Sequence, residues 1–276
     1  EMKNKRTNIG FIGAGNMARA LISGLIGDGY NNSHIFASSP EDDHLERLKK
    51  EFSVNVTPKN KDVLDSCLTV VLAVKPNVIN SVLKESKFTI NKNNNLLISI
   101  VAGCTINSIQ AEVGKEVKII RAMPNTPASI GMGVSALTNN HLVTLEDRVR
   151  AENIFNSVGI SCWLKEASFD LYTALIGSGP AYVFYLIEAL QLSAKKLGLN
   201  EKLSKTLIIE MITGSAVLAK ESKLSPSSLR KKVTSPGGVT EKALQILNEN
   251  KVDKSLIKAI LEGENKSKAL GGIKSE

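Results

Sequence analysis

The pattern of apolar residues along this 276-residue chain changes once, close to residue 165. Before that point, short runs rich in Val and Ile alternate with stretches in which apolar residues recur every three or four positions. This alternation is typical of βαβ units on a mainly parallel sheet. After that point the helical spacing continues with no strand pattern between its segments. The sequence therefore predicts an α/β domain with a doubly wound sheet over residues 1–165, and an all-helical domain over residues 166–276.

The individual elements follow from the same periodicities. Strands are predicted over residues 8–12, 34–37, 69–74, 96–101, 117–122 and 134–137, and helices between them over residues 16–27 and 41–51. In the second domain, helices are predicted over residues 170–197, 201–220, 227–233, 239–248 and 254–269.

Charge and composition exclude some classes of function. The net charge is +8, but Lys and Arg are spread along the chain among acids, and aromatic residues make up only 4%. Nucleic-acid binding needs a clustered basic stripe with aromatic platforms, so it is not expected. No unbroken apolar run approaches the roughly 18 residues of a membrane span, and the three widely spaced cysteines show no metal-ligand spacing. We therefore expect a soluble cytoplasmic protein with reduced thiols, no membrane contact and no metal site.

A glycine motif follows the first predicted strand and opens the first predicted helix, as Gly13-x-Gly15-x-x-Ala18. In this context it matches the dinucleotide-binding fingerprint of a Rossmann-type fold. Gly13 allows the tight turn, Gly15 lets a pyrophosphate approach the backbone, and Ala18 lets helix and strand pack closely. A purely structural turn from strand to helix is the alternative.

The end of the second strand indicates which dinucleotide binds. An NAD site usually places an acid there for the ribose 2′-hydroxyl, but this strand ends in Ser38 and Ser39. Hydroxyl groups can donate to a 2′-phosphate, so NADPH is predicted, with NADH still open because acids follow at residues 41–43. Lys75 ends the next central strand and is expected to face cofactor or substrate, unless it simply faces solvent.

A second glycine-rich segment lies in the helical half, where Ser235-Pro-Gly-Gly238-Val-Thr240 runs into a helical pattern. The first N–H groups of a helix lack partners and carry partial positive charge, so this segment predicts an anion site. One chain with two anion sites suggests a cofactor and an acidic substrate that are brought together.

The helices of the second half carry more apolar surface than one small helical domain can bury. We therefore expect a homodimer built from these helices. The alternative is a compact helical cap on the sheet of its own chain.

Five motifs in this order resemble those of the pyrroline-5-carboxylate reductase family, and the similarity runs nearly end to end. They are residues 9–18, Ala73-Val-Lys-Pro76, Met123-Pro-Asn-Thr-Pro127, Gly177-Ser-Gly-Pro-Ala-Tyr182 and residues 233–240. The resemblance implies reduction of 1-pyrroline-5-carboxylate to L-proline by NAD(P)H, the last step of proline biosynthesis. It also implies a homodimer with interleaved C-terminal helices, and the family can assemble further.

The resemblance also assigns residues to the site. Its cofactor contacts fall on Ile12, Gly13, Ala14, Gly15, Asn16, Met17, Ser38, Asn60, Ala73, Val74, Lys75, Pro76, Ala102 and Gly103. Its substrate contacts fall on Ser235, Gly238, Val239, Thr240 and Glu166. Lys232 stands where related enzymes can carry Asn, which leaves its role open.

The implied substrate is a cyclic imine that is electrophilic once protonated, so placement matters more than a strong base. Thr240 is the predicted catalytic residue, as hydrogen-bond partner of the ring nitrogen, and a helix cap is its alternative role. Two rival functions stay open. A hydroxyacid or ketoacid reductase would need a catalytic lysine, and the segment after Gly179, Pro-Ala-Tyr-Val-Phe-Tyr, has none where related hydroxyacid enzymes place theirs. A non-catalytic dinucleotide sensor would not need the second anion site.

Overall fold

The computed structural model describes residues 8–271, which form two compact units. The first holds residues 8–178 together with 263–271, and the second holds Gly179–Glu262.

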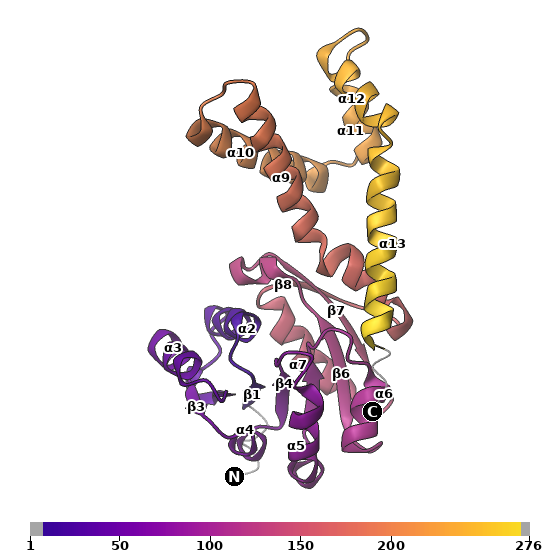
Figure 1. Ribbon diagram of the computed structural model, residues 1–276. Helices are drawn as coiled ribbons and strands as arrows, with labels where there is room; N and C mark the ends of the chain where they lie inside the picture. The colour runs from indigo at the N-terminus through magenta and orange to yellow at the C-terminus, as the bar shows by residue number, and fades with distance from the viewer. Residues whose placement is uncertain (1–7, 272–276) are drawn as a thin grey trace. The chain divides into compact units, whose positions relative to one another are not determined.

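An eight-stranded sheet forms the centre of the first unit (Figure 1). Its strands are β1 (Ile9–Ile12), β2 (Ile35–Ser38), β3 (Asn55–Thr57), β4 (Thr69–Leu72), β5 (Leu96–Ser99), β6 (Lys118–Met123), β7 (Gly133–Asn139) and β8 (Gly159–Trp163). Their order across the sheet is β3-β2-β1-β4-β5-β6-β7-β8. The chain thus builds outward from β1 in one direction and then, from β4, in the other, as in a doubly wound sheet.

One pair breaks the parallel pattern, since β6 and β7 run antiparallel while all other neighbours are parallel. The connection between them holds only the short 3-10 helix η2 (Thr126–Ile130). A parallel crossover needs about a dozen residues or more, so the chain turns back instead.

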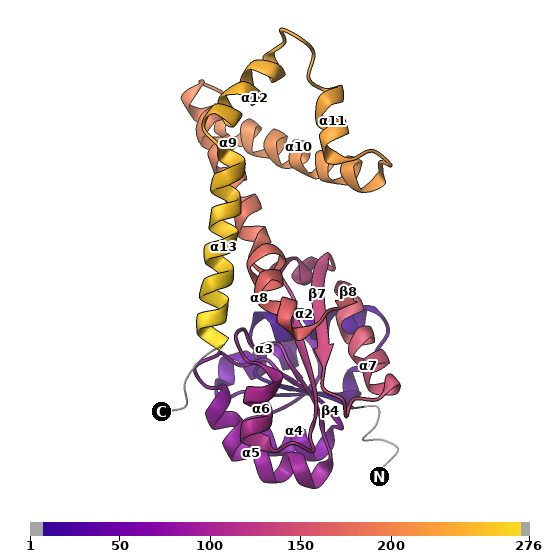
Figure 2. The ribbon, with the colours of Figure 1, turned by 90° about the vertical axis from the view of Figure 1, so that its right-hand side faces the viewer.

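Helices cover both faces of this sheet, which Figure 2 shows nearly edge-on. On one face, α2 (Asn16–Gly27), α3 (Asp42–Phe52) and α7 (Leu145–Asn156) share a buried cluster with β1 and β5. On the other face, α4 (Asn60–Ser66), α5 (Ile79–Asn93) and α6 (Ile106–Val113) share a second cluster. Strands buried on both sides read as unbroken apolar runs, as Val70, Val71 and Leu72 of β4 do.

The first unit closes with a short helical segment and the end of the last helix. The 3-10 turn η3 (Glu166–Ser168), α8 (Phe169–Tyr172) and the π turn η4 (Thr173–Gly177) follow β8. Phe169 and Tyr172 pack with Met123 in a third buried cluster. The Tyr172 hydroxyl donates to the Val134 carbonyl at 2.8 Å, and burial raises the pKa of Tyr172, so this phenol is a packing group.

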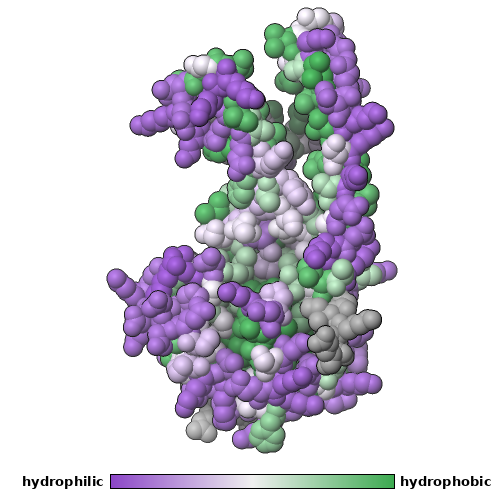
Figure 3. Space-filling view, viewed as in Figure 1, coloured by the Kyte–Doolittle hydropathy of each residue, from purple (hydrophilic) through white to green (hydrophobic). Residues whose placement is uncertain are grey.

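The second unit consists of helices and the turns that connect them, with no strand among residues 179–262. It contains α9 (Gly179–Lys196), α10 (Glu201–Glu221), α11 (Pro226–Lys232), α12 (Val239–Glu249) and the first half of α13 (Val252–Gly271). Ser204 is the one buried residue among residues 179–262. Large apolar side chains stay exposed on these helices, among them Val183, Phe184, Tyr185, Leu186, Leu192, Leu203, Leu207 and Met211. Figure 3 shows green, hydrophobic surface on this unit among the purple, hydrophilic surface.

The helical run Glu166–Lys196 differs from one expectation. The sequence contains no long unbroken apolar run, yet an 18-residue window of this helix is apolar enough to cross a membrane by length and composition alone. Only 6% of that window is buried. An exposed apolar face of this kind indicates a surface that packs against another surface.

Candidate functional site

The sheet topology itself creates a crevice. β1 lies between β2 and β4. From β2 the chain continues to β3 on one side of the sheet, and from β4 it continues to β5 on the other side. Ligands of doubly wound sheets bind outside the carboxyl ends of the strands at such a switch point. The fingerprint residues lie at this edge, because Gly13 follows β1 directly.

Gly13 and Gly15 have different structural reasons to be glycine. Gly13 has a φ of +101°, and a Cβ there would lie 2.5 Å from the Ala73 carbonyl oxygen. Its N–H donates to the Ser38 carbonyl at 2.8 Å, which ties the turn to β2. Gly15 begins α2 with no side-chain cap, and a Cβ there would meet nothing within 4 Å. The open space and the uncapped helix start fit a pyrophosphate that approaches the backbone.

Ser38 and Asn60 interact with each other beside this turn. The Ser38 residue is fully buried, and its hydroxyl donates to Asn60 Oδ1 at 2.8 Å. Asn60 begins α4 and is only half-buried. The Ser38 hydroxyl is therefore already committed as a donor, whereas the Asn60 amide nitrogen makes no hydrogen bond within residues 8–271. Asn60 is thus the group at this position that can donate to a ligand.

The segments after β4 and β5 lie side by side at the same edge. The Ala73 N–H donates to the Ile12 carbonyl at 2.8 Å, and the Ile100 N–H donates to the Leu72 carbonyl at 3.1 Å. Pro76, Ala102 and Gly103 line one small hollow of about 50 Å³ together with Leu270 of α13. Lys75 is exposed, so its ammonium is free to reach a phosphate.

Glu166 joins this region through two contacts of one oxygen. Its Oε1 accepts from the Ile106 N–H at 2.8 Å and from Arg121 NH1 at 3.2 Å. Arg121 is 2% exposed and was not among the residues predicted from the sequence. The signal for it was an arginine directly after two isoleucines and before an alanine, in the strand run of residues 117–122. Cys104 lies nearby in the same loop region, and burial raises the pKa of its thiol.

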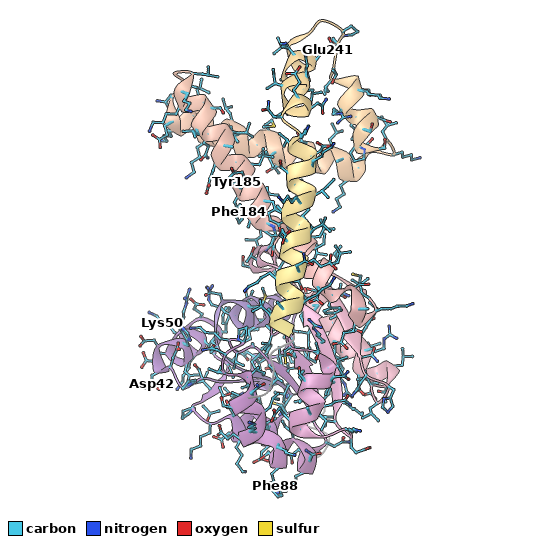
Figure 4. All side chains as sticks on the ribbon, turned by 45° about the vertical axis from the view of Figure 1, so that its right-hand side comes forward. Asp42, Lys50, Phe88, Phe184, Tyr185 and Glu241 are labelled. Carbon is cyan, nitrogen blue, oxygen red and sulfur yellow. The ribbon has the colours of Figure 1, made fainter. Side chains whose placement is uncertain are left out.

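The second predicted anion site is a turn at the start of α12. Gly237 has a φ of +71°, and a Cβ on Gly238 would lie 2.9 Å from the Ser235 carbonyl oxygen. The Gly238 N–H donates to that carbonyl at 3.0 Å, so it is used within the turn. The Gly237 N–H donates to Glu241 Oε2 at 2.7 Å, and Figure 4 labels Glu241 on this helix. The helix start has no side-chain cap, which leaves the backbone N–H of Val239, in the first turn, available to an anion.

Thr240 is not a helix cap. It is the second residue of α12, where Gly238 is the N-cap, and its hydroxyl makes no hydrogen bond within residues 8–271. Of the two roles weighed for Thr240, the structure therefore leaves the side chain free to contact a ligand. Lys232 ends α11 and is exposed, without an ion pair in the described chain.

The first unit thus brings together one set of predicted residues. The hydrogen bonds and the hollow described above join the segments that carry Ile12, Gly13, Ala14, Gly15, Asn16, Met17, Ser38, Asn60, Ala73, Val74, Lys75, Pro76, Ala102, Gly103 and Glu166. Ser235, Gly238, Val239 and Thr240 belong to the second unit. Among residues 8–271 no group of three His, Cys, Asp or Glu side chains could hold a metal ion.

Two family descriptions match this chain. Residues 166–270 match "pyrroline-5-carboxylate reductase dimerisation", and residues 8–103 match "NADP oxidoreductase coenzyme F420-dependent". The chain is 37% identical to the pyrroline-5-carboxylate reductase of Pseudomonas aeruginosa, over 88% of this chain and 89% of that protein. It is 35% identical to the Escherichia coli enzyme, over 95% and 97%.

Solved structures give the same result. The Coxiella burnetii pyrroline-5-carboxylate reductase superposes with a TM-score of 0.89 at 39% identity, covering 95% of this chain and 98% of that one. The Plasmodium falciparum pyrroline carboxylate reductase, solved with NADP bound, gives 0.88 at 34% identity, covering 97% and 99%. A prephenate dehydrogenase from A. aeolicus gives 0.53 at 14% identity, over 94% of this chain and 96% of that one, and shares the fold alone.

Proposed function

The chain belongs to the pyrroline-5-carboxylate reductase family, and on that premise we propose that its two glycine-lined sites divide one reaction between cofactor and substrate. It is an NADP-dependent oxidoreductase that reduces the C=N bond of 1-pyrroline-5-carboxylate to give L-proline. The observation that carries the cofactor half is the open, uncapped helix start at Gly15. NADPH, when bound, supplies the hydride for this reduction.

We propose that the cofactor is held by the residues gathered at the carboxyl edge of the sheet. The turn from Ile12 to Met17 receives the pyrophosphate on backbone N–H groups at the start of α2. Asn60 donates its amide N–H to the 2′-phosphate, and the buried Ser38 hydroxyl orients Asn60 through Oδ1. Lys75 adds a positive charge, and the segments 73–76 and 102–103 border the nicotinamide end.

The substrate carboxylate is proposed to bind at the start of α12. Val239 and Thr240 offer backbone N–H groups there, and Ser235 offers a hydroxyl at the turn. Gly238 contributes shape rather than a donor, because its N–H already binds the Ser235 carbonyl. The substrate contact predicted for Glu166 stays a prediction, because the contacts that its carboxylate makes in the described chain are to Ile106 and Arg121.

Thr240 is the proposed catalytic residue. Its hydroxyl is free of other partners in the described chain and stands beside the first-turn N–H groups of α12. From there it can hydrogen-bond the ring nitrogen while the helix start holds the carboxylate, which orients the protonated imine for hydride transfer. No strong base is required, because the protonated imine is already electrophilic.

The assembly is proposed to be a homodimer with interleaved C-terminal helices that can assemble further. The match of residues 166–270 to the dimerisation domain supports this, as do the exposed apolar faces of α9 and α10. The same match supports a domain boundary at residues 165 and 166. A place in the cytoplasm is proposed from the biosynthetic role of the relatives.

An NADPH oxidation assay with 1-pyrroline-5-carboxylate tests this function, with NADH and a simple ketoacid as comparison arms. We expect turnover with the imine, little with the ketoacid, and higher efficiency with NADPH than with NADH. Turnover of the ketoacid alone would show a hydroxyacid-type reductase. Tight NADPH binding without any turnover would show a dinucleotide sensor.

A further inference from the structure

Arg121 is a buried cation in the middle of the sheet. It lies in β6, paired with Ser99 of β5 and Thr138 of β7, and its side chain is only 3% exposed. The guanidinium carbon lies 4.7 Å from the centroid of the Phe169 ring, and Nε has no hydrogen-bond partner among residues 8–271. A buried charge is costly unless it is paired, and in the described part of the chain the one carboxylate that pairs with Arg121 is that of Glu166.

The Glu166 carboxylate connects three elements through a single oxygen. Oε1 accepts from Arg121 NH1 of β6 and from the backbone N–H of Ile106, while Glu166 itself begins η3. Ile106 is the first residue of α6, where an N–H group has no partner within the helix. A negative charge at this end also interacts favourably with the helix dipole. Glu166 therefore fixes the position of the start of α6.

The start of α6 is also the far end of the loop that follows β5. The near end of this loop is held by β5, where the Val101 N–H lies 3.3 Å from Ser99 Oγ. Within the loop, the Cys104 N–H donates to the Val101 carbonyl at 3.3 Å, and Gly103 has a φ of +74°. Both ends are thus anchored, one by the strand and the other by the Ile106–Glu166–Arg121 connection.

We propose that Arg121 and Glu166 are positioning residues that set this loop against the cofactor for hydride transfer. The inference rests on the proposed function, which places residues 102–103 beside the nicotinamide. Neither side chain needs to touch substrate in this role. The pair acts through the loop backbone, and loosening it disturbs the alignment of the reacting atoms while both ligands still bind.

The test compares Glu166→Gln, Arg121→Met and the double variant with the unmodified chain. Glu166→Gln keeps an oxygen for the Ile106 N–H but removes the charge opposite Arg121. We expect kcat to fall about 10-fold or more, because small misplacements are costly in hydride transfer, with KM and the NADPH dissociation constant within about 2-fold. With NADPH deuterated at C4, the isotope effect on kcat should rise. The losses of the two single variants should not add in the double variant.

Lys118→Met is the matched control. Lys118 lies on the same strand and pairs with a buried carboxylate, Asp147, at 2.9 Å, but at the opposite end of β6. It should lower the melting temperature and leave kcat and the isotope effect unchanged. Glu166 is half-buried, so Glu166→Gln provides a folded variant even if Arg121→Met unfolds.

Four outcomes would count against the inference or its premise. A raised KM with unchanged kcat in Glu166→Gln would mean that Glu166 binds substrate directly. An unchanged kcat and isotope effect with a lower melting temperature would make the pair a stabilising contact only. If the unmodified chain itself fails to reduce the imine, the proposed function is wrong. If the unmodified chain is active and the variants have the same kcat, KM and isotope effect, only this inference is wrong.

Discussion

Leu21 of α2 and Leu192 of α9 both lie on apolar faces of long helices, yet the first is fully buried and the second is 54% exposed. The same contrast holds for the units around them. In the first unit, two clusters of apolar side chains fill both faces of the sheet, whereas among residues 179–262 only Ser204 is buried. An amphipathic face with nothing packed on it signals a missing surface. The first unit therefore folds around its own core, whereas the exposed apolar faces of the second unit fit the proposed homodimer.

The largest expected effect comes from a charge placed on the uncovered helices. Phe184 on α9 is 56% exposed and Phe88 on α5 is 78% exposed, and both are labelled in Figure 4. Phe184→Glu should weaken the dimer by about 3–5 kcal/mol, because a buried, unpaired charge is that costly. Light scattering should show the monomer mass, with activity lost. Phe88→Glu should keep the dimer mass. If both variants stay dimeric, α9 does not carry the interface.

Truncation of a leucine to alanine in each unit tests whether its side chain packs within its own chain. Leu21→Ala should destabilise the protein by about 2–5 kcal/mol, because it leaves a cavity in a closed core. Leu192→Ala should cost under about 0.5 kcal/mol where only monomer exists, as surface substitutions do. Urea unfolding at two protein concentrations measures both. An equal cost for Leu192→Ala in dilute monomer would show that α9 packs within its own chain.

Thr240→Ala tests the catalytic role given to the second unit. Turnover should fall by one or two orders of magnitude, or about 1.4–2.7 kcal/mol, through the loss of a hydrogen bond made in the transition state. NADPH binding and the melting temperature should not change. Thr206→Ala is the control, because Thr206 is exposed on α10 and donates only to the Lys202 carbonyl. Unchanged turnover in Thr240→Ala would remove Thr240 from the mechanism.

Gly15→Ala tests the cofactor role of the first unit. A Cβ at Gly15 meets no protein atom, so stability should hold while the NADPH dissociation constant rises about 10-fold through crowding of the bound phosphate. Fluorescence titration with NADPH measures the change. Gly27, at the other end of α2, also has open space, and Gly27→Ala should bind NADPH normally. Normal binding in Gly15→Ala would place the phosphate elsewhere.

The smallest expected effect is on the pH dependence of stability, through Asp147 in the first turn of α7. Burial raises the pKa of Asp147, but hydrogen bonds from Lys118 and Thr144 outweigh it, and the net pKa lies below its usual value. This stabilisation is present above the unfolded-state pKa of about 3.9 and is lost as the pH falls through the lower folded-state pKa. Asp147→Asn should flatten the loss of stability in acid unfolding curves. Glu146→Gln, at a 70% exposed side chain, should not. If Asp147→Asn loses stability with falling pH as steeply as the unmodified protein does, Asp147 is not a source of this pH dependence.

The sequence predicted the elements with strong periodicity and missed those without it. Helix α2 has the predicted bounds, whereas β3 and β8 were not predicted. β3 has three residues, Asn55 to Thr57, two of them polar, and β8 is an edge strand whose apolar Ile160 points outward at 66% exposure. Short or edge strands bury too little to leave a pattern in the sequence. The antiparallel pairing of β6 and β7 follows from the short connection between them, which holds only η2.

The site shows the same limit. The fingerprint predicted the turn at Gly13 and Gly15 because backbone conformation dictates glycine there. The sequence could not predict that the Ser38 hydroxyl bonds Asn60, or that Arg121 reaches Glu166, since those contacts join residues 22 and 45 positions apart. Such pairs form only once the sheet has set the strands in register.

The course of α13 has a consequence for synthesis of the chain. Its last turns belong to the first unit, where Ser267 donates to Asp170 Oδ1 at 2.7 Å and Leu270 lines the hollow beside Pro76. A ribosome completes the sheet long before it releases these residues. The sheet of the first unit is therefore synthesised before Leu270, which completes the lining of that hollow. Leu270 is synthesised only after the residues of the second unit.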